Sequence, residues 1–74
     1  MSETLRDQVA APVLLTAREV SDLTRISVST LHDYAVRREH GLPADGPPHL
    51  RLGPRRRRWD REDVLTWIRA SRVS

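Results

Sequence analysis

Two helix-start signals, at Thr16 and Ser27, constrain this chain more than any other feature, because they lie close together. Glu19 follows Thr16 by three residues. This is the spacing of a capping box, in which each side chain accepts a hydrogen bond from the other residue's backbone N–H. Leu15 stands just before the cap, where an apolar residue can pack against the first turn. Because the second start follows so soon, the first helix has room for only about two turns.

Two short helices are therefore expected, joined by a turn of about four residues. The first should run from Ala17 to Leu23 and the second from Val28 to Arg38. Gly41 should end the second helix, since glycine readily adopts the left-handed conformation found after helix ends, and Pro43 cannot continue it. This arrangement is the helix-turn-helix pattern.

A basic β-hairpin should follow the second helix. The segment His49–Leu52 alternates polar and apolar residues, which predicts a short strand with Leu50 and Leu52 facing inward. A turn at Gly53-Pro54 would then lead into a second strand over Arg55–Trp59.

The second strand decides which hairpin side chains reach the core. If Trp59 points inward, the two-residue period of a strand sends Arg56 and Arg58 outward, with Arg55 near the tip. We expect Trp59 and Tyr34 in the core, because the chain has no Phe and few other large apolar side chains.

A third helix should begin at Asp60, whose side chain can cap it, and run to about Ala70. Its apolar face would be supplied by Val64, Leu65, Trp67 and Ile68. The order helix, turn, helix, basic hairpin, helix predicts a mainly α domain with a small β-hairpin, a winged helix-turn-helix. The hairpin is the wing.

Chain length and charge suggest one domain with an anionic partner. The 74 residues suffice for one small core, with residues 1–12 expected as a flexible tail and 13–72 as the domain. All thirteen basic residues are Arg. Residues 1–50 carry five Arg and seven acidic residues, a net −2, whereas 51–74 carry eight Arg and three acidic residues, a net +5. The basic excess therefore lies in the wing and the last helix.

Several classes of protein are disfavoured. No Cys is present, so disulfides and thiolate zinc sites are excluded. The spacing of His32, His40 and His49 fits no metal site, and His40 and His49 are expected on the surface. No nucleophile, acid–base pair or Gly-rich phosphate loop stands out, so we expect no enzyme, cofactor or metal. The apolar run Val9–Leu15 is too short to span a bilayer, which predicts a cytoplasmic protein.

In a helix-turn-helix, the second helix enters the DNA major groove and places its first side chains against base edges. The candidate contact residues are Val28, Ser29, Thr30, His32, Asp33 and Arg37. Two interpretations of Asp33 and Arg37 remain open. They lie four apart and can form an exposed ion pair, or Asp33 can accept from a cytosine amino group while Arg37 holds a phosphate.

The run of Arg55, Arg56, Arg57 and Arg58 has a similar pair of interpretations. An isolated charge run is usually a solvated turn. Here four adjacent cations repel one another on a hairpin that follows a helix-turn-helix. A polyanion would relieve that repulsion, and Arg is the side chain that enters a narrow minor groove. The context favours DNA contact by all four.

Three segments carry a family resemblance: Leu14–Leu23, Ile26–Leu31 and Arg51–Val64. They resemble the first helix, the turn with the start of the recognition helix, and the wing with the closing helix of excisionase and AlpA-like proteins. These are small MerR-like winged helix-turn-helix proteins, and the resemblance covers about residues 14–70. It implies one helix in the major groove and a wing in the adjacent minor groove. It also adds Ser27 to the recognition helix.

Two positions depart from the family pattern. Arg25 stands where the family usually has a turn glycine, which would cost roughly 1 kcal/mol if the residue is left-handed. The loop Gly41–His49 is longer than usual and contains three prolines.

The resemblance implies a role in site-specific recombination. A phage or mobile-element excisionase, also called a recombination directionality factor, binds repeated duplex DNA sites cooperatively with further copies of itself. It bends the DNA and directs an integrase toward excision. The alternatives are a small AlpA-type transcriptional regulator, or a protein-interaction module whose basic wing binds an acidic partner.

Overall fold

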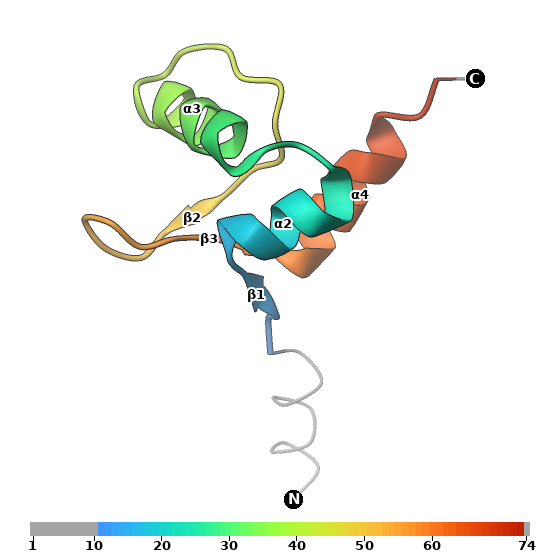
Figure 1. Ribbon diagram of the computed structural model, residues 1–74, viewed down its shortest axis with the longest axis horizontal. Coiled ribbons are helices and arrows are strands. Elements are labelled where there is room, and N and C mark those ends of the chain that lie inside the picture. Colours follow the sequence, from blue (N-terminus) through green and yellow to red (C-terminus); the bar gives the residue numbers. More distant parts are fainter. Residues whose placement is uncertain (1–10, 74) are drawn as a thin grey trace, which may run out of the picture.

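The computed structural model describes residues 11–73, so most of the predicted N-terminal tail lies outside the described part. Figure 1 shows three helices around a small sheet. The elements are β1 (Leu14–Leu15), α2 (Ala17–Thr24), α3 (Val28–Glu39), β2 (Leu50–Arg51), β3 (Arg57–Asp60) and α4 (Arg61–Ala70). This order confirms the predicted winged helix-turn-helix. The wing comprises β2, β3 and the turn between them.

The helix starts are those predicted from the caps. The Glu19 N–H donates to Thr16 Oγ1 at 3.2 Å, and the Thr16 N–H donates to Glu19 Oε1 at 2.9 Å, which completes the capping box. Ser27 Oγ accepts from the Thr30 N–H at 3.2 Å, and Asp60 caps α4. Because caps depend on residues close in sequence, local spacing was enough to locate all three starts.

The turn between α2 and α3 contains a strained residue. Arg25 has φ 64° and ψ 14°, the left-handed conformation, and its N–H donates to Ser21 O at 2.7 Å to close α2. A side chain in this conformation costs about 1 kcal/mol, which a glycine would avoid. The residue that stands at the family's glycine position is therefore left-handed, as that glycine would be, and carries backbone strain.

The core is small and contains residues from all three helices and β3. Its fully buried members are Val20, Leu31, Ala35, Trp59 and Val64. Trp59 is 1% exposed, which confirms its predicted core position. Tyr34 is half-buried, and of the predicted α4 face only Val64 is buried, with Ile68 still 37% exposed. Leu65 and Trp67 are partly buried, so the burial of this face decreases toward the C-terminal end of α4.

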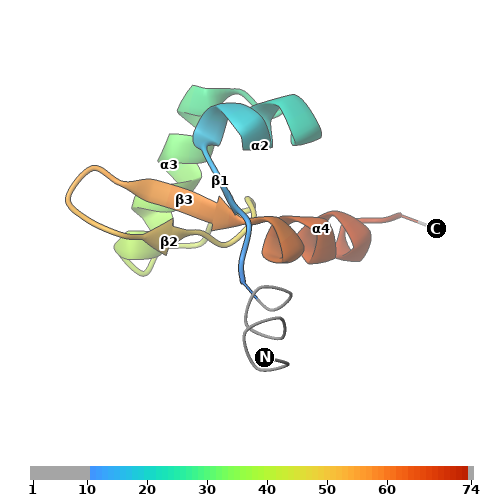
Figure 2. The same ribbon diagram turned by 90° about the horizontal axis from the view of Figure 1, so that it is seen from below.

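The sheet has one strand more than the predicted hairpin. β3 lies in the middle and pairs antiparallel with β1 on one side and β2 on the other. Leu15 pairs with Trp59. Next to β1, the Arg61 N–H donates to Val13 O at 2.9 Å. Figure 2 shows β1 running alongside β3 and continuing into α2. A two-residue strand has too little periodicity to be recognised from sequence.

The predicted inward face of β2 is wrong. Leu50 and Leu52 are 38% and 56% exposed, whereas the His49 side chain is only 6% exposed. The cause is the register, in which Arg51 pairs with Arg57, two residues from buried Trp59. Residues paired across a sheet share a face, so the Leu side chains must point the other way. The His49 side chain is accordingly shielded from solvent, although the residue was expected on the surface.

The long loop before β2 is packed against α3. Gly46 is buried against the Tyr34 ring, and a Cβ at this position would collide with that ring. Arg38 Nη2 donates to Gly46 O at 2.6 Å. The loop therefore covers the Tyr34 side of α3. Within residues 11–73, no helix has the length and apolar character needed to cross a bilayer.

Replacing Arg25 with glycine is expected to raise the free energy of unfolding by about 0.5–1 kcal/mol, because glycine adopts the left-handed conformation without strain. The same substitution at exposed Arg18, inside α2, should lower it by about 1 kcal/mol. Urea denaturation of both variants measures the two changes. Equal losses at the two positions would contradict the strain at Arg25.

Candidate nucleic-acid interface

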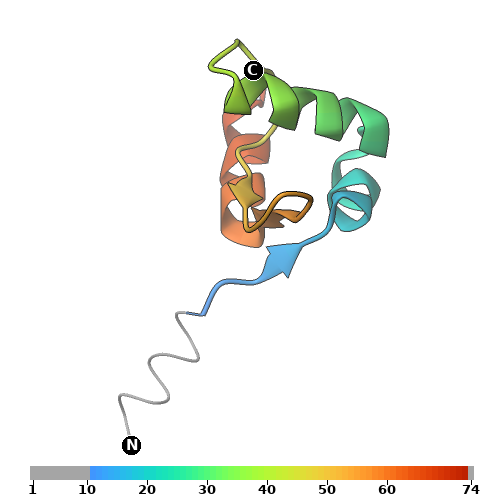
Figure 3. The ribbon, with the colours of Figure 1, turned by 90° about the vertical axis from the view of Figure 1, so that its left-hand side faces the viewer.

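The predicted contact residues of α3 lie mainly on its exposed side. Five are exposed: Ser27, Ser29, His32, Asp33 and Arg37. Val28 and Thr30 are partly buried. Figure 3 looks onto the face along which α3 runs, with the tip of the wing on the same face. The structure therefore brings the two predicted contact elements to one side of the molecule.

Hydroxyl groups gather at the N-terminal end of α3. Ser27 Oγ donates to Thr30 Oγ1 at 2.8 Å and lies 3.3 Å from Ser29 Oγ. Hydroxyls and backbone N–H groups at a helix start can donate to phosphate oxygens or to base edges. This end of the helix therefore presents hydrogen-bonding groups of the kind that contact nucleic acids.

The middle of the exposed face holds an ion pair. Arg37 Nε lies 3.1 Å from Asp33 Oδ2, and the two side chains are 52% and 61% exposed. An exposed pair of this spacing contributes only about 0.3–0.5 kcal/mol. Both groups can thus separate at little cost, so the pair leaves each available to a base or a phosphate.

The tip of the wing presents arginines to solvent. The Leu52 N–H donates to Arg56 O at 2.7 Å, which closes the turn, and Arg55 and Arg56 are exposed there. Arg58 is half-buried and donates from Nη1 to Arg57 O at 2.8 Å. Within residues 11–73, Arg55, Arg56 and Arg58 form no ion pair.

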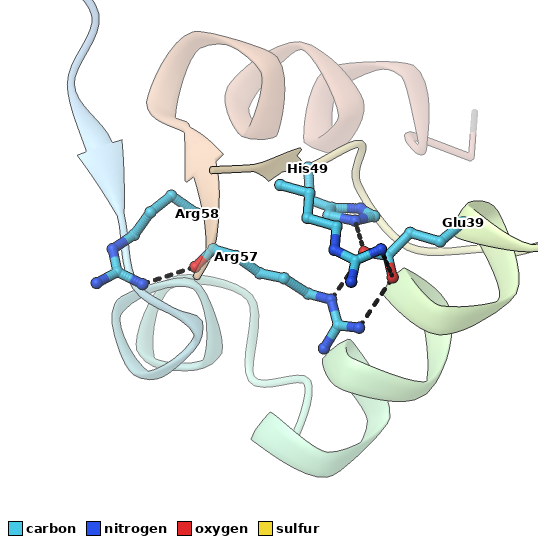
Figure 4. A network of polar contacts seen from close by, with 5 residues as sticks. Glu39, His49, Arg57 and Arg58 are labelled. Atoms are coloured by element: carbon cyan, nitrogen blue, oxygen red, sulfur yellow. Dashed lines mark hydrogen bonds and ion pairs between the residues drawn. The ribbon is translucent and has the colours of Figure 1, made fainter. Parts of the chain in front are cut away.

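Arg57 differs from its neighbours because it is bound to Glu39, the last residue of α3. Its Nε and Nη2 donate to the two carboxylate oxygens at 2.8 and 2.9 Å. His49 Nε2 lies 2.7 Å from Glu39 Oε2, and Arg51 Nη1 lies 3.8 Å from Oε1. Figure 4 shows the side chains of His49 and Arg57 pointing toward the Glu39 carboxylate. The four residues form the Glu39 cluster.

The cluster stabilises the ionised form of Glu39. The hydrogen bonds from Arg57, and then from His49, lower the pKa of Glu39 from 4.5 to about 2. The same contact raises the pKa of Arg57. A carboxylate at a helix C-terminus is unfavourable by itself, because the helix dipole is negative there. The wing cations offset this cost, so the end of α3 is attached to the wing.

The comparisons with known proteins agree with this geometry. A protein-family model described as a helix-turn-helix domain matches residues 14–72. The chain belongs to the helix-turn-helix domain family. This family includes excisionase-like and AlpA-like DNA-binding proteins, so a DNA-binding domain is the class to which the chain belongs. No curated protein and no solved structure matches it significantly.

The helix-turn-helix domain contains polar residues that the sequence did not single out. Glu39, His49 and Arg51 were not among the predicted functional residues, and Arg57 was expected to contact DNA. The one local signal was an acidic residue at the end of a helix whose last turn is otherwise basic. Among the described residues, no group of His, Asp or Glu is arranged to hold a metal ion.

The free energy of unfolding should fall as the pH drops from about 4.5 to about 2, partly because of Glu39. Glu39 stays ionised in the folded domain but binds a proton near pH 4.5 in the unfolded chain, so acid favours unfolding across this window. Urea denaturation of the wild type and Glu39→Gln at several pH values measures the effect. The stability difference between them should be largest above pH 4.5 and shrink toward pH 2; parallel profiles would contradict it.

Proposed function

We propose that this helix-turn-helix domain is an architectural DNA-binding protein of the excisionase type. The observation that carries the proposal is the placement of α3 and the tip of the wing, two elements that carry exposed polar and basic residues, on one side of the molecule (Figure 3). In this proposal α3 occupies the major groove and contacts base edges. The wing lies along the neighbouring backbone and minor groove.

The dimensions and the chemistry of the two elements support this placement. α3 has 12 residues, which makes it about 18 Å long. The major groove of DNA is wide enough to admit an α-helix. The contact residues proposed on α3 are Ser27, Val28, Ser29, Thr30, His32, Asp33 and Arg37. On the wing we propose Arg55, Arg56 and Arg58 for phosphate or minor-groove contacts. Arg57 contributes indirectly, since its guanidinium is engaged by Glu39.

The excisionase role is supported by the small amount of DNA that one such domain can cover. A single module buries only about 600–1,000 Å² of protein surface, so strong binding needs adjacent copies or a second DNA-bound protein. Repeated sites beside a recombination site would supply the copies, and an integrase the second protein. The binding energy would offset a bend in the DNA that costs on the order of 1–6 kcal/mol.

Replacing Arg56 and Arg58 together with alanine should weaken binding to every duplex sequence. Because two phosphate contacts are lost, the slope of log affinity against log salt should flatten by about 1.8. Fluorescence anisotropy with a random-sequence duplex at several salt concentrations measures both effects. Arg69→Ala, on the exposed last turn of α4, removes a cation outside the interface and should leave the slope unchanged. A loss confined to some sequences would show that the wing reads bases instead.

The recombination role is tested by recovering fragments of the source genome with the purified protein at near-physiological salt and sequencing them. We expect enrichment of a short array of direct repeats beside an integrase attachment site. Enrichment at a promoter would support the AlpA-type regulator instead. An absence of enrichment at any salt would contradict DNA binding and direct the search to an acidic protein partner.

A further inference from the structure

Arg57 carries the same charge as the neighbouring arginines of the wing but differs from them in its ion pairing. Within residues 11–73, Arg55, Arg56 and Arg58 form no ion pair, whereas Arg57 donates two hydrogen bonds to one carboxylate. A bidentate pair of this kind fixes the orientation of the guanidinium as well as its position. Arg57 is therefore the wing arginine that the folded domain keeps from a phosphate.

Glu39 connects α3 to both strands of the wing. Arg57 belongs to β3, Arg51 belongs to β2, and His49 immediately precedes β2. The side chains of Glu39, His49 and Arg57 are 17%, 6% and 21% exposed. The three side chains are thus largely shielded from water, which strengthens their interaction compared with an exposed ion pair. In Figure 4 the Glu39 carboxylate lies between the end of α3 and the wing.

We propose that Glu39 is a positioning residue that determines how well the domain distinguishes one DNA sequence from another. It holds the wing at one distance and angle from α3, and it withholds the charge of Arg57 from the phosphate backbone. This inference rests on the proposed DNA binding.

The physical reason lies in the difference between specific and non-specific complexes. Non-specific binding comes from phosphate contacts, and a wing that moves independently of α3 can make them in any register. A wing held against α3 makes its contacts together with the base contacts of the helix, in one register. Rigid linkage therefore weakens non-specific binding. It favours the specific complex, because the wing is already ordered relative to α3 and loses less conformational entropy on binding.

The test compares Glu39→Gln, which keeps the side-chain shape, with Glu62→Gln as a matched control. Glu62 lies on α4, its side chain is 75% exposed, and its removal changes the net charge equally. Wild-type protein first selects its preferred sequence from a randomised duplex pool. All three proteins are then titrated, across a salt series, against the selected duplex and against a random-sequence duplex.

We expect Glu39→Gln to bind the random duplex more tightly, with a salt slope steeper by about 1 because Arg57 gains a phosphate contact. Binding to the selected duplex should weaken, so that the ratio of the two affinities falls roughly tenfold. Glu62→Gln should keep the wild-type ratio. Adding Arg57→Gln to Glu39→Gln should return the slope to the wild-type value, since the released cation is then absent.

A second pair of variants tests the inference even if Glu39→Gln does not fold. Arg57→Gln should leave the salt slope of the wild type unchanged, because Arg57 does not contact phosphate. Arg56→Gln, the adjacent residue, should flatten the slope by about 0.9. Equal flattening by both would overturn the inference.

The remaining outcomes separate this inference from the proposed function. If Glu39→Gln keeps the wild-type ratio, or loses affinity for both duplexes equally with an unchanged slope, Glu39 has only a structural role. DNA binding would then stand without this inference. If the wild type binds neither duplex at any salt, the proposed function itself fails.

Discussion

The burial of Trp59 is the constraint on which the rest of the structure depends. Its side chain is 1% exposed, and β3, which carries it, pairs with both other strands. The next residue, Asp60, caps α4. A chain of 74 residues without Phe has few alternatives for a core of this size. A slip of one residue in β3 would expose the indole and place Arg58 inside, where an unpaired charge is strongly unfavourable.

The same register divides the basic run into two groups. Arg57 shares the face of Trp59 and reaches Glu39, whereas Arg58 points to the opposite face of the strand. Arg51, the partner of Arg57 across the sheet, lies on the same side as well. The repulsion among four consecutive arginines is therefore partly relieved inside the folded domain. The charge that remains lies at the tip of the wing and on the face of β3 opposite Trp59.

Local sequence patterns predicted the helices and the wing. They could not predict how these elements pair with parts of the chain that are distant in sequence. The caps at Thr16, Ser27 and Asp60 involve neighbours within three residues, so spacing alone located the helices. The shielding of the His49 side chain depends on strand register, and the hydrogen bond from Arg57 to Glu39 joins residues 18 apart in sequence. Such contacts become visible only once the wing has been placed against α3.

The two ends of α3 serve different purposes. At its C-terminal end, consecutive residues attach it in two directions, Arg38 to the loop carbonyl of Gly46 and Glu39 to the wing. At its N-terminal end, Ser27 caps the helix, and both Ser27 and Ser29 are exposed. Because the attachments are made during folding, the orientation of the exposed end is set before any ligand arrives. The entropy cost of orienting the helix and the wing is then incurred during folding and not during binding. A larger part of the contact energy therefore contributes to binding affinity.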